Sequence, residues 1–250
     1  MKVLARKILR KFGYELVKLK ESSHLPVDFV QEVIEVIRLV RPYTMTSVER
    51  IAALVDAVNY VEKAKIPGSI VECGVWRGGS MMAIAYTLKR LGACNRDLYL
   101  FDTFEGMTKP TDVDVSHAGQ PASIEFNEAR TSNEGPGMCH ASIEDVRSNL
   151  LATGYDPERL KFIKGRVEET IPEHAPPQIS ILRLDTDWYE STSHELMYLF
   201  PRLCVGGVII IDDYGHWQGV RKSVDEYVDR NNTLILLNRI DYTGRMAIKQ

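Results

Sequence analysis

From residue 69 onward, short β-rich segments alternate with segments of helical periodicity, and this alternation constrains the fold more than any other feature of the sequence. Neighbouring parallel strands need a crossover connection, usually a helix, so the pattern is typical of a parallel sheet covered on both faces. The expected strands are 69–73, 98–101, 160–163, 179–184 and 207–211, and the expected helices are 80–91, 142–152, 192–200 and 219–228. The sequence therefore predicts an α/β fold.

Two further β-rich segments, 233–237 and 245–248, lie near the end of the chain and are separated by a turn around 242–244. The turn is too short for a crossover helix, so we expect these segments to pair antiparallel. The complete prediction is a mainly parallel seven-stranded sheet that ends in a C-terminal antiparallel hairpin.

The domain organisation follows from the segments that do not fit this alternation. Residues 1–42 are expected to form an N-terminal basic, amphipathic helical segment, and 43–250 the main domain. Within the first segment, a helix is expected over 27–40 and ends before Pro42. At the start of the main domain, Thr46-Ser47-Val48-Glu49 has the pattern of a capping box for the next helix. Residues 103–140 are rich in Gly, Pro, Ser, Thr and acids, and we interpret them as a lid, because loops of that length in compact domains are usually lids, binding loops or disordered.

Charge and hydropathy indicate where in the cell the protein is expected and which kinds of partner it can bind. Residues 1–20 carry seven Lys or Arg side chains and one acid, Glu15, which allows weak contact with an anionic membrane surface, although packing on the domain or on a partner subunit is favoured. No apolar stretch reaches the roughly 18 residues of a spanning helix, and the first residues lack the apolar region and cleavage site typical of a signal peptide, so a cytoplasmic protein is expected. The net charge of −3 argues against nucleic acid. The four cysteines lack metal or CxxC spacing.

A glycine-rich loop joins the first expected strand to its helix. Its glycines let the backbone approach a ligand and expose N–H groups at a helix N-terminus. The spacing is neither G-x-G-x-x-G nor a P-loop, and the acid before the turn suits a cationic ammonium and sulfonium better than a pyrophosphate. A tight turn without a ligand is the alternative, and the loop alone does not decide. The candidate residues are Glu72, Cys73, Gly74, Val75, Gly78, Gly79 and Ser80.

The ends of the second and third strands favour a nucleoside ligand at the same edge of the sheet. Asp102 and Thr103 follow the second strand, where an acid can accept hydrogen bonds from a ribose diol, although such an acid can also cap a loop. Glu168 follows the third strand and is expected near the adenine. Ligands of open α/β sheets bind outside the carboxyl ends of the strands, so these features support one another.

Two acidic pairs follow the fourth and fifth strands, Asp185 with Asp187 and Asp212 with Asp213. If these strands are neighbours, their carboxylates converge, and the repulsion between them calls for a cation or protons. All-oxygen ligands suit Mg²⁺ rather than zinc, so we predict Asp185, Asp212 and Asp213 as metal ligands and Asp187 as a group that reaches the substrate. His216 is a second candidate base, because an unperturbed imidazole titrates near neutral pH.

With these residues in view, the sequence from about 43 to 249 resembles the TylF/MycF family of macrocin-type sugar O-methyltransferases. The matching segments are 43–46 with Glu49-Arg50, then 71–80, 101–106, 184–192 and 211–217. The resemblance implies a Rossmann-like class I methyltransferase fold, S-adenosylmethionine as donor, and Mg²⁺ at Asp185, Asp212 and Asp213. It also implies Asp187 as general base. The segment with Thr44, Met45 and Ser47 is expected to close over the methionine part of the donor.

The expected function is therefore transfer of a methyl group to a hydroxyl of a small molecule. The family's acceptors are mainly deoxysugar hydroxyls on antibiotics, and its members are commonly homodimers or larger homo-oligomers. Mg²⁺ would lower the pKa of the hydroxyl as a Lewis acid, and Asp187 would take the proton. Two alternatives are a metal-dependent methyltransferase of catechol-like phenols and a non-catalytic protein that binds S-adenosylmethionine or S-adenosylhomocysteine.

Overall fold

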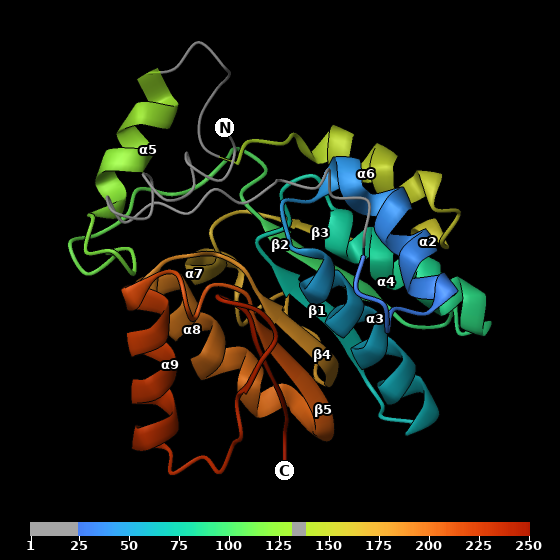
Figure 1. The fold of residues 1–250 in the computed structure, drawn as a ribbon. Coiled ribbons are helices and arrows are strands. Elements are labelled where there is room, and N and C mark those ends of the chain that lie inside the picture. Colours follow the sequence, from blue (N-terminus) through green and yellow to red (C-terminus); the bar gives the residue numbers. More distant parts are fainter. Residues whose placement is uncertain (1–24, 132–138) are drawn as a thin grey trace, which may run out of the picture.

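A seven-stranded sheet runs through the middle of the molecule in the computed structural model, which describes residues 25–131 and 139–250 (Figure 1). Strands β1 to β5 are parallel to one another, while β7 is antiparallel to both β5 and β6, in the order β3-β2-β1-β4-β5-β7-β6. This confirms the predicted sheet. The strands are β1 (Ser69–Cys73), β2 (Leu98–Asp102), β3 (Leu160–Lys164), β4 (Ile179–Leu184), β5 (Leu203–Ile211), β6 (Asn238–Arg239) and β7 (Arg245–Ile248).

Helices cover both faces of the sheet, because the strand side chains alternate between two apolar clusters. In β5, for example, Val208 and Ile210 belong to one cluster, and Ile209 and Ile211 to the other. The first face carries α2 (Gln31–Val40), η1 (Arg41–Tyr43), α3 (Val48–Lys63), α4 (Gly79–Leu91) and α6 (Ile143–Ala152). The second carries α7 (Val167–Thr170), α8 (Tyr189–Leu199), η3 (Phe200–Arg202) and α9 (Gln218–Arg230), while η2 (Pro157–Arg159) leads into β3.

Two local predictions were wrong. Residues 233–237 are not a strand, because the Thr233 N–H closes the end of α9 on the Val228 carbonyl and the chain meets β7 only at 238. Leu234 and Leu236 of this segment are 82% and 72% exposed. The cap of α3 also lies one residue later than predicted: the Ser47 hydroxyl, not Thr46, accepts from the Arg50 N–H at 3.1 Å.

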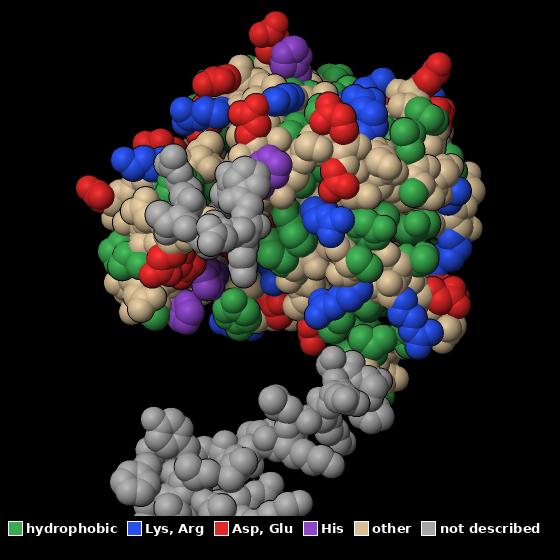
Figure 2. Space-filling model, turned by 90° about the horizontal axis from the view of Figure 1, so that it is seen from above, with side chains coloured by type: hydrophobic (Ala, Val, Ile, Leu, Met, Phe, Trp, Pro, Cys, Tyr) green, Lys and Arg blue, Asp and Glu red, His purple; other side chains and the backbone are tan. Residues whose placement is uncertain are grey.

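The described part of the N-terminal segment packs on the main domain. Helix α2 buries Val33, Val36, Ile37 and Val40 in the same cluster as α3 and α4. The predicted basic stretch 1–20 lies outside the described residues. No helix among the described residues has the length and hydropathy needed to cross a bilayer. Lys, Arg, Asp and Glu side chains intermingle over the described part of the face in Figure 2.

The first part of the predicted lid is tied to the domain by hydrogen bonds. Asp114 is fully buried and accepts from the backbone N–H of Tyr189 at 2.8 Å, at the start of α8. Next along the chain, the His117 N–H donates to the His216 carbonyl at 2.7 Å. Helix α5 (Ala122–Thr131) lies within the predicted lid and stands apart from the two helical layers in Figure 1. Residues 132–138 lie outside the described part of the chain.

Candidate active site

A pocket of about 410 Å³ lies at the carboxyl ends of the parallel strands, where the sequence predicts a ligand. Most predicted site residues line it: Thr44, Met45, Glu72, Gly74, Val75, Gly79, Ser80, Asp102, Thr103, Glu168, Asp185, Asp187, Asp212, Asp213 and His216. Ser47, Cys73 and Gly78 are not among its lining residues. Ser47 caps α3, the Cys73 side chain is buried in the core, and Gly78 precedes α4 in a left-handed conformation (φ 86°).

Glycines bring three segments together at the end of the pocket that the turn after β1 forms. Gly74 has φ 79°, and a Cβ there would overlap the carbonyl oxygen of Asp185, so the turn after β1 lies directly against the loop after β4. A Cβ on Gly79 would lie 2.5 Å from the Tyr43 carbonyl oxygen and 2.6 Å from the Thr44 Cβ. The N-terminal segment predicted to cover the donor therefore rests on the first turn of α4.

Asp102 organises the glycine turn. Its Oδ2 accepts from the backbone N–H groups of Val75 at 2.6 Å and Trp76 at 3.2 Å, and its Oδ1 accepts from Phe104 at 2.6 Å. Burial raises the pKa of Asp102, and these backbone donors oppose the shift. Its predicted contact with a ribose remains a prediction, and any such contact would add to the bonds that already hold the loop.

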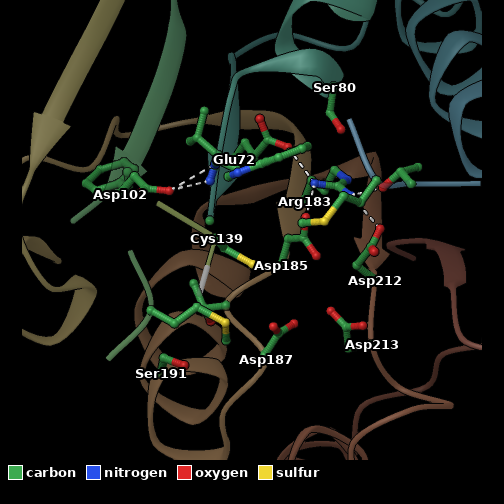
Figure 3. A pocket seen from close by; sticks show the side chains of 18 of the residues that line it. Glu72, Ser80, Asp102, Cys139, Arg183, Asp185, Asp187, Ser191, Asp212 and Asp213 are labelled. Carbon is green, nitrogen blue, oxygen red and sulfur yellow. Dashed lines mark hydrogen bonds and ion pairs between the residues drawn. The ribbon is translucent and has the colours of Figure 1, made fainter. Parts of the chain in front are cut away.

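Three carboxylates meet at the other end of the pocket. Strands β4 and β5 are neighbours, and one oxygen each from Asp185, Asp187 and Asp213 lies within 4.8 Å of the others (Figure 3). Asp187 has φ 66°, an uncommon conformation for a residue other than glycine. Burial raises the pKa of Asp187 to about 7, and burial and the neighbouring carboxylates raise those of Asp185 and Asp213 well above their ordinary values. Asp213 Oδ2 is buried without a hydrogen-bond partner among the described residues.

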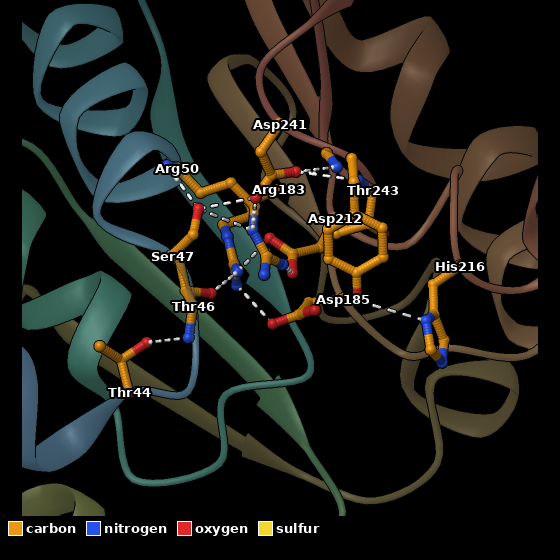
Figure 4. Close-up of polar contacts among 12 residues, drawn as sticks. Thr44, Thr46, Ser47, Arg50, Arg183, Asp185, Asp212, His216, Asp241 and Thr243 are labelled. Carbon is orange, nitrogen blue, oxygen red and sulfur yellow. Dashed lines mark hydrogen bonds and ion pairs between the residues drawn. The ribbon is translucent and has the colours of Figure 1, made fainter. Parts of the chain in front are cut away.

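Asp212 points away from this group toward two arginines (Figure 4). The Arg183 guanidinium donates to Asp212 Oδ1 at 2.5 Å, and Arg50 pairs with Asp212 Oδ2. Arg183 also donates to Asp185 at 2.7 Å and to Glu72 at 2.5 Å. Asp212 thus lines the pocket as a partner of cations. Its predicted role as a metal ligand stays a prediction.

Arg50 joins the two ends of the domain at the site. Its Nε donates to Asp241 Oδ2 at 3.0 Å, and the Ser47 hydroxyl donates to the same oxygen at 2.6 Å. Asp241 belongs to the turn between β6 and β7, so the start of α3 is fastened to the C-terminal hairpin. The sequence prediction missed both Arg50 and Arg183 as site residues. The sequence did contain a signal for Arg183, since it is the one charged residue of the buried strand β4.

An aromatic rim borders the carboxylates. His216 Nδ1 lies 3.4 Å from the Tyr242 hydroxyl, and the His117 and His216 ring centroids are 5.3 Å apart. Burial, and then the neighbouring His117, lower the pKa of His216, which favours the neutral ring. Tyr242 is 60% exposed, and Trp217 packs edge-on against Trp188. These side chains offer apolar ring faces beside hydrogen-bonding edges.

The fold and this two-part pocket define a Rossmann-like class I methyltransferase. The solved structure of the O-methyltransferase NovP covers 83% of this chain and 82% of its own, with a TM-score of 0.72 and 29% identity. The model of the TylF family, described as macrocin-O-methyltransferase, matches residues 38–248. The chain belongs to the TylF macrocin O-methyltransferase family. It is an O-methyltransferase, and the family implies S-adenosylmethionine as methyl donor.

Two curated relatives agree with this assignment. The 8-demethyl-8-(2,3-dimethoxy-alpha-L-rhamnosyl)-tetracenomycin-C 4'-O-methyltransferase of Streptomyces olivaceus is 34% identical over 202 residues, which are 81% of this chain and 74% of that protein. The mycinamicin III 3''-O-methyltransferase of Micromonospora griseorubida is 31% identical over 202 residues, which are 81% of this chain and 76% of that protein.

Proposed function

We propose that this protein transfers a methyl group from S-adenosylmethionine to a sugar hydroxyl of a small-molecule natural product, with the help of Mg²⁺. The observation that carries this proposal is the cluster of three carboxylates, from Asp185, Asp187 and Asp213, at one end of the pocket. The glycine turn after β1 forms the other end. A donor bound along the turn would present its methyl group to an acceptor held beside the carboxylates.

The residues at the carboxylate end fit a divalent cation. The repulsion among the three carboxylates is reduced by an ion, and the orphaned, buried Asp213 Oδ2 offers a free acceptor. Oxygen ligands of this kind suit Mg²⁺. Asp185 and Asp213 would hold the ion together with Asp212, which would have to exchange a guanidinium partner for it. When bound, Mg²⁺ supplies Lewis-acid polarisation that lowers the pKa of the acceptor hydroxyl.

Asp187 has the position required of a general base. Its carboxylate adjoins the two proposed ligands, so it can accept the proton of a hydroxyl held between them. His216 lies farther along the rim and is already in contact with Tyr242 and His117. We therefore assign the proton transfer to Asp187, and assign His216 to the wall of the acceptor site.

The donor end is acidic, which suits a cationic sulfonium. Glu72 is 1% exposed, and its Oε2 has no hydrogen-bond partner among the described residues, so it can receive a donor ammonium group. Asp102 and Glu168 line the same end. Thr44 and Met45 border it from the N-terminal side, and Met45 is 62% exposed and free to fold over a bound donor.

A sugar acceptor is supported by the relatives and by the rim. The relatives' names place their methyl groups on position 4' of a rhamnosyl tetracenomycin C and on position 3'' of mycinamicin III. The exposed ring of Tyr242 offers a face on which a sugar ring can stack. A sugar alcohol is also a far weaker acid than a phenol, so it has more need of a metal and a base. We therefore favour a sugar over a catechol-like acceptor.

Two experiments test this function. Methyl transfer is measured against glycosides, free sugars, nucleotide sugars and catechols, with and without EDTA, and product positions are assigned by NMR. Full turnover in EDTA and in Asp185→Asn would contradict the metal site, and turnover of catechols alone would contradict the sugar. Calorimetry with S-adenosylhomocysteine, with and without Mg²⁺, separates an enzyme from a protein that only binds the donor.

We also propose that the protein forms a homo-oligomer. Light scattering tests this proposal by measuring the molecular mass in solution.

A further inference from the structure

Glu195 is a fully buried acid that the proposed reaction does not use. It lies in the second turn of α8 and has no exposed surface. Its Oε1 accepts from the Thr186 hydroxyl at 2.9 Å, while Oε2 is buried without a hydrogen-bond partner among the described residues. An acid buried among neutral groups costs free energy, so its position calls for a compensating role.

Its partner occupies a central position in the site. Thr186 separates Asp185, a proposed ligand, from Asp187, the proposed base. The backbone of this loop is fastened on both sides: the Asp185 N–H donates to the Cys73 carbonyl at 2.9 Å, and the Trp188 N–H donates to the Thr186 carbonyl at 2.9 Å. The bond from Thr186 to Glu195 adds a side-chain tie to the interior of the protein at the middle of the loop.

The loop needs such a tie because of its conformation. With φ 66°, Asp187 is in the left-handed region, which costs an ordinary L-residue free energy and persists only where the surroundings impose it. This conformation keeps the Asp187 carboxylate with those of Asp185 and Asp213. If the middle of the loop were released, Asp187 would be free to relax to negative φ and its carboxylate would turn away from the other two.

Glu195 also lies close to the donor side of the site. Burial raises the pKa of the Cys73 thiol well above its ordinary value, and Glu195 adds to that shift, which places the carboxyl group beside the last residue of β1. The glycine turn begins at the next residue. One side chain of α8 therefore adjoins both the end of β1 and the loop after β4.

We propose that Glu195 is a positioning residue, which through the Thr186 hydroxyl holds the loop of Asp185 and Asp187 in the conformation that binds the metal and presents the base. This inference rests on the proposed function. Burial raises the pKa of Glu195 to about 8, so near neutral pH the side chain is mostly the uncharged acid. A glutamine can then replace it with the same shape and still accept the bond from Thr186.

The test compares five variants with one control variant. Thr186→Val and Glu195→Met each remove the bond, Thr186→Ser and Glu195→Gln each keep it, and the double variant Thr186→Val with Glu195→Met removes both partners. Thr87→Val is the matched control, because the Thr87 hydroxyl is also fully buried and donates to the Ala83 carbonyl at 2.7 Å, in α4. For each protein the melting temperature, the Mg²⁺ affinity in the presence of S-adenosylhomocysteine, and the S-adenosylhomocysteine affinity are measured.

We expect Thr186→Val and Glu195→Met to weaken Mg²⁺ binding roughly 10- to 100-fold, the usual effect of losing a group that orients a metal ligand. The double variant should lose no more Mg²⁺ affinity than the single variant that loses more, because both changes break the same bond. Thr186→Ser, Glu195→Gln and Thr87→Val should stay within about 3-fold of the unchanged protein, and S-adenosylhomocysteine affinity should change less than Mg²⁺ affinity throughout.

Unchanged Mg²⁺ affinity in Thr186→Val, or losses that add in the double variant, would overturn the inference while leaving the proposed function intact. An equal fall in Mg²⁺ affinity for Thr87→Val would overturn it too, since it would reveal a general effect of destabilisation. If Glu195→Met does not fold, the comparison of Thr186→Val with Thr186→Ser decides. Absence of Mg²⁺ binding by the unchanged protein would overturn both the proposed metal site and this inference.

Discussion

Arg183 and Glu72 form a buried ion pair of 2.5 Å between the neighbouring strands β4 and β1, with their side chains 3% and 1% exposed. The same guanidinium reaches Asp185 and Asp212, so one side chain connects the donor end of the pocket with the carboxylate end. We expect Arg183→Met to lower the free energy of unfolding by about 3–5 kcal/mol, because it leaves buried carboxylates without their cation. Arg183→Lys should lose less, since it keeps the charge but not the planar fork.

Urea denaturation of the protein without metal or donor measures this effect. The control is Lys222→Met, which removes an exposed cation 3.9 Å from Glu226 and should change the free energy of unfolding by less than about 1 kcal/mol. A loss below about 1 kcal/mol for Arg183→Met would show that the buried pair is not a structural requirement.

Asp212→Asn and Asp187→Asn separate the two roles proposed for the acidic residues. We expect Asp212→Asn to weaken Mg²⁺ binding, and Asp187→Asn to lower kcat roughly 10²- to 10⁴-fold with Mg²⁺ affinity retained, because it removes a base rather than a ligand. Calorimetry and steady-state kinetics are the measurements. If Asp187→Asn weakened Mg²⁺ binding and Asp212→Asn did not, Asp187 would be assigned to the metal, which its closeness to Asp185 and Asp213 also allows. His216→Asn should reduce kcat far less than Asp187→Asn.

Gly79→Ala tests the contact between the N-terminal segment and the donor turn. A Cβ at this position would push the Tyr43 carbonyl and Thr44 away from α4. We expect the affinity for S-adenosylhomocysteine to fall about tenfold or more, or roughly 1.4 kcal/mol, as measured by calorimetry. Gly92→Ala is the control: its Cβ meets nothing within 4 Å, so donor affinity should hold, while stability should fall because Gly92 is in the left-handed region (φ 69°).

Tyr242→Ala tests the acceptor wall. Tyr242 is exposed at the rim beside His216, and loss of its ring should raise the acceptor KM roughly 3- to 10-fold, with donor KM and Mg²⁺ affinity unchanged. Tyr242→Phe keeps the ring face and should retain most of the acceptor affinity. Equal effects of both changes would assign the contribution to the hydroxyl instead of the ring.

The stability of the protein should fall as pH rises through the titration of Glu195. Its pKa is raised by burial from 4.5 to about 8, so the folded state binds the proton more tightly than the unfolded state. The stabilisation is complete below pH 4.5 and is lost as pH rises to about 8, an effect on the order of a few kcal/mol.

Glu195→Gln removes this contribution, so the difference in urea midpoint between pH 5 and pH 9 should shrink relative to the unchanged protein. Glu190→Gln, at an exposed position of the same helix, should leave the difference as it is. An unaltered pH dependence in Glu195→Gln would show that the buried acid does not titrate in this range.

Local patterns in the sequence were sufficient for the sheet and for the position of the pocket. Apolar runs such as 179–184 and 207–211 can only be buried strands when helical segments separate them, and the carboxyl ends of parallel strands share one edge of the sheet. Acidic pairs directly after two such strands therefore had to come together once the strands were neighbours. The same reasoning wrongly predicted a strand at 233–237, because the hydrogen bonds of this segment depend on where α9 ends.

The partners of the individual acidic side chains in the site depended on contacts between residues that are far apart in the chain. Asp212 and Asp213 are adjacent in sequence, yet one faces two arginines and the other the pocket, because neighbouring residues at a strand end point in different directions. Arg50 meets Asp241 across 191 positions, and Arg183 meets Glu72 across 111. The sequence alone determined which carboxylates gather at the sheet edge. Only the tertiary structure decided which of them pair with arginines and which lie together in the pocket.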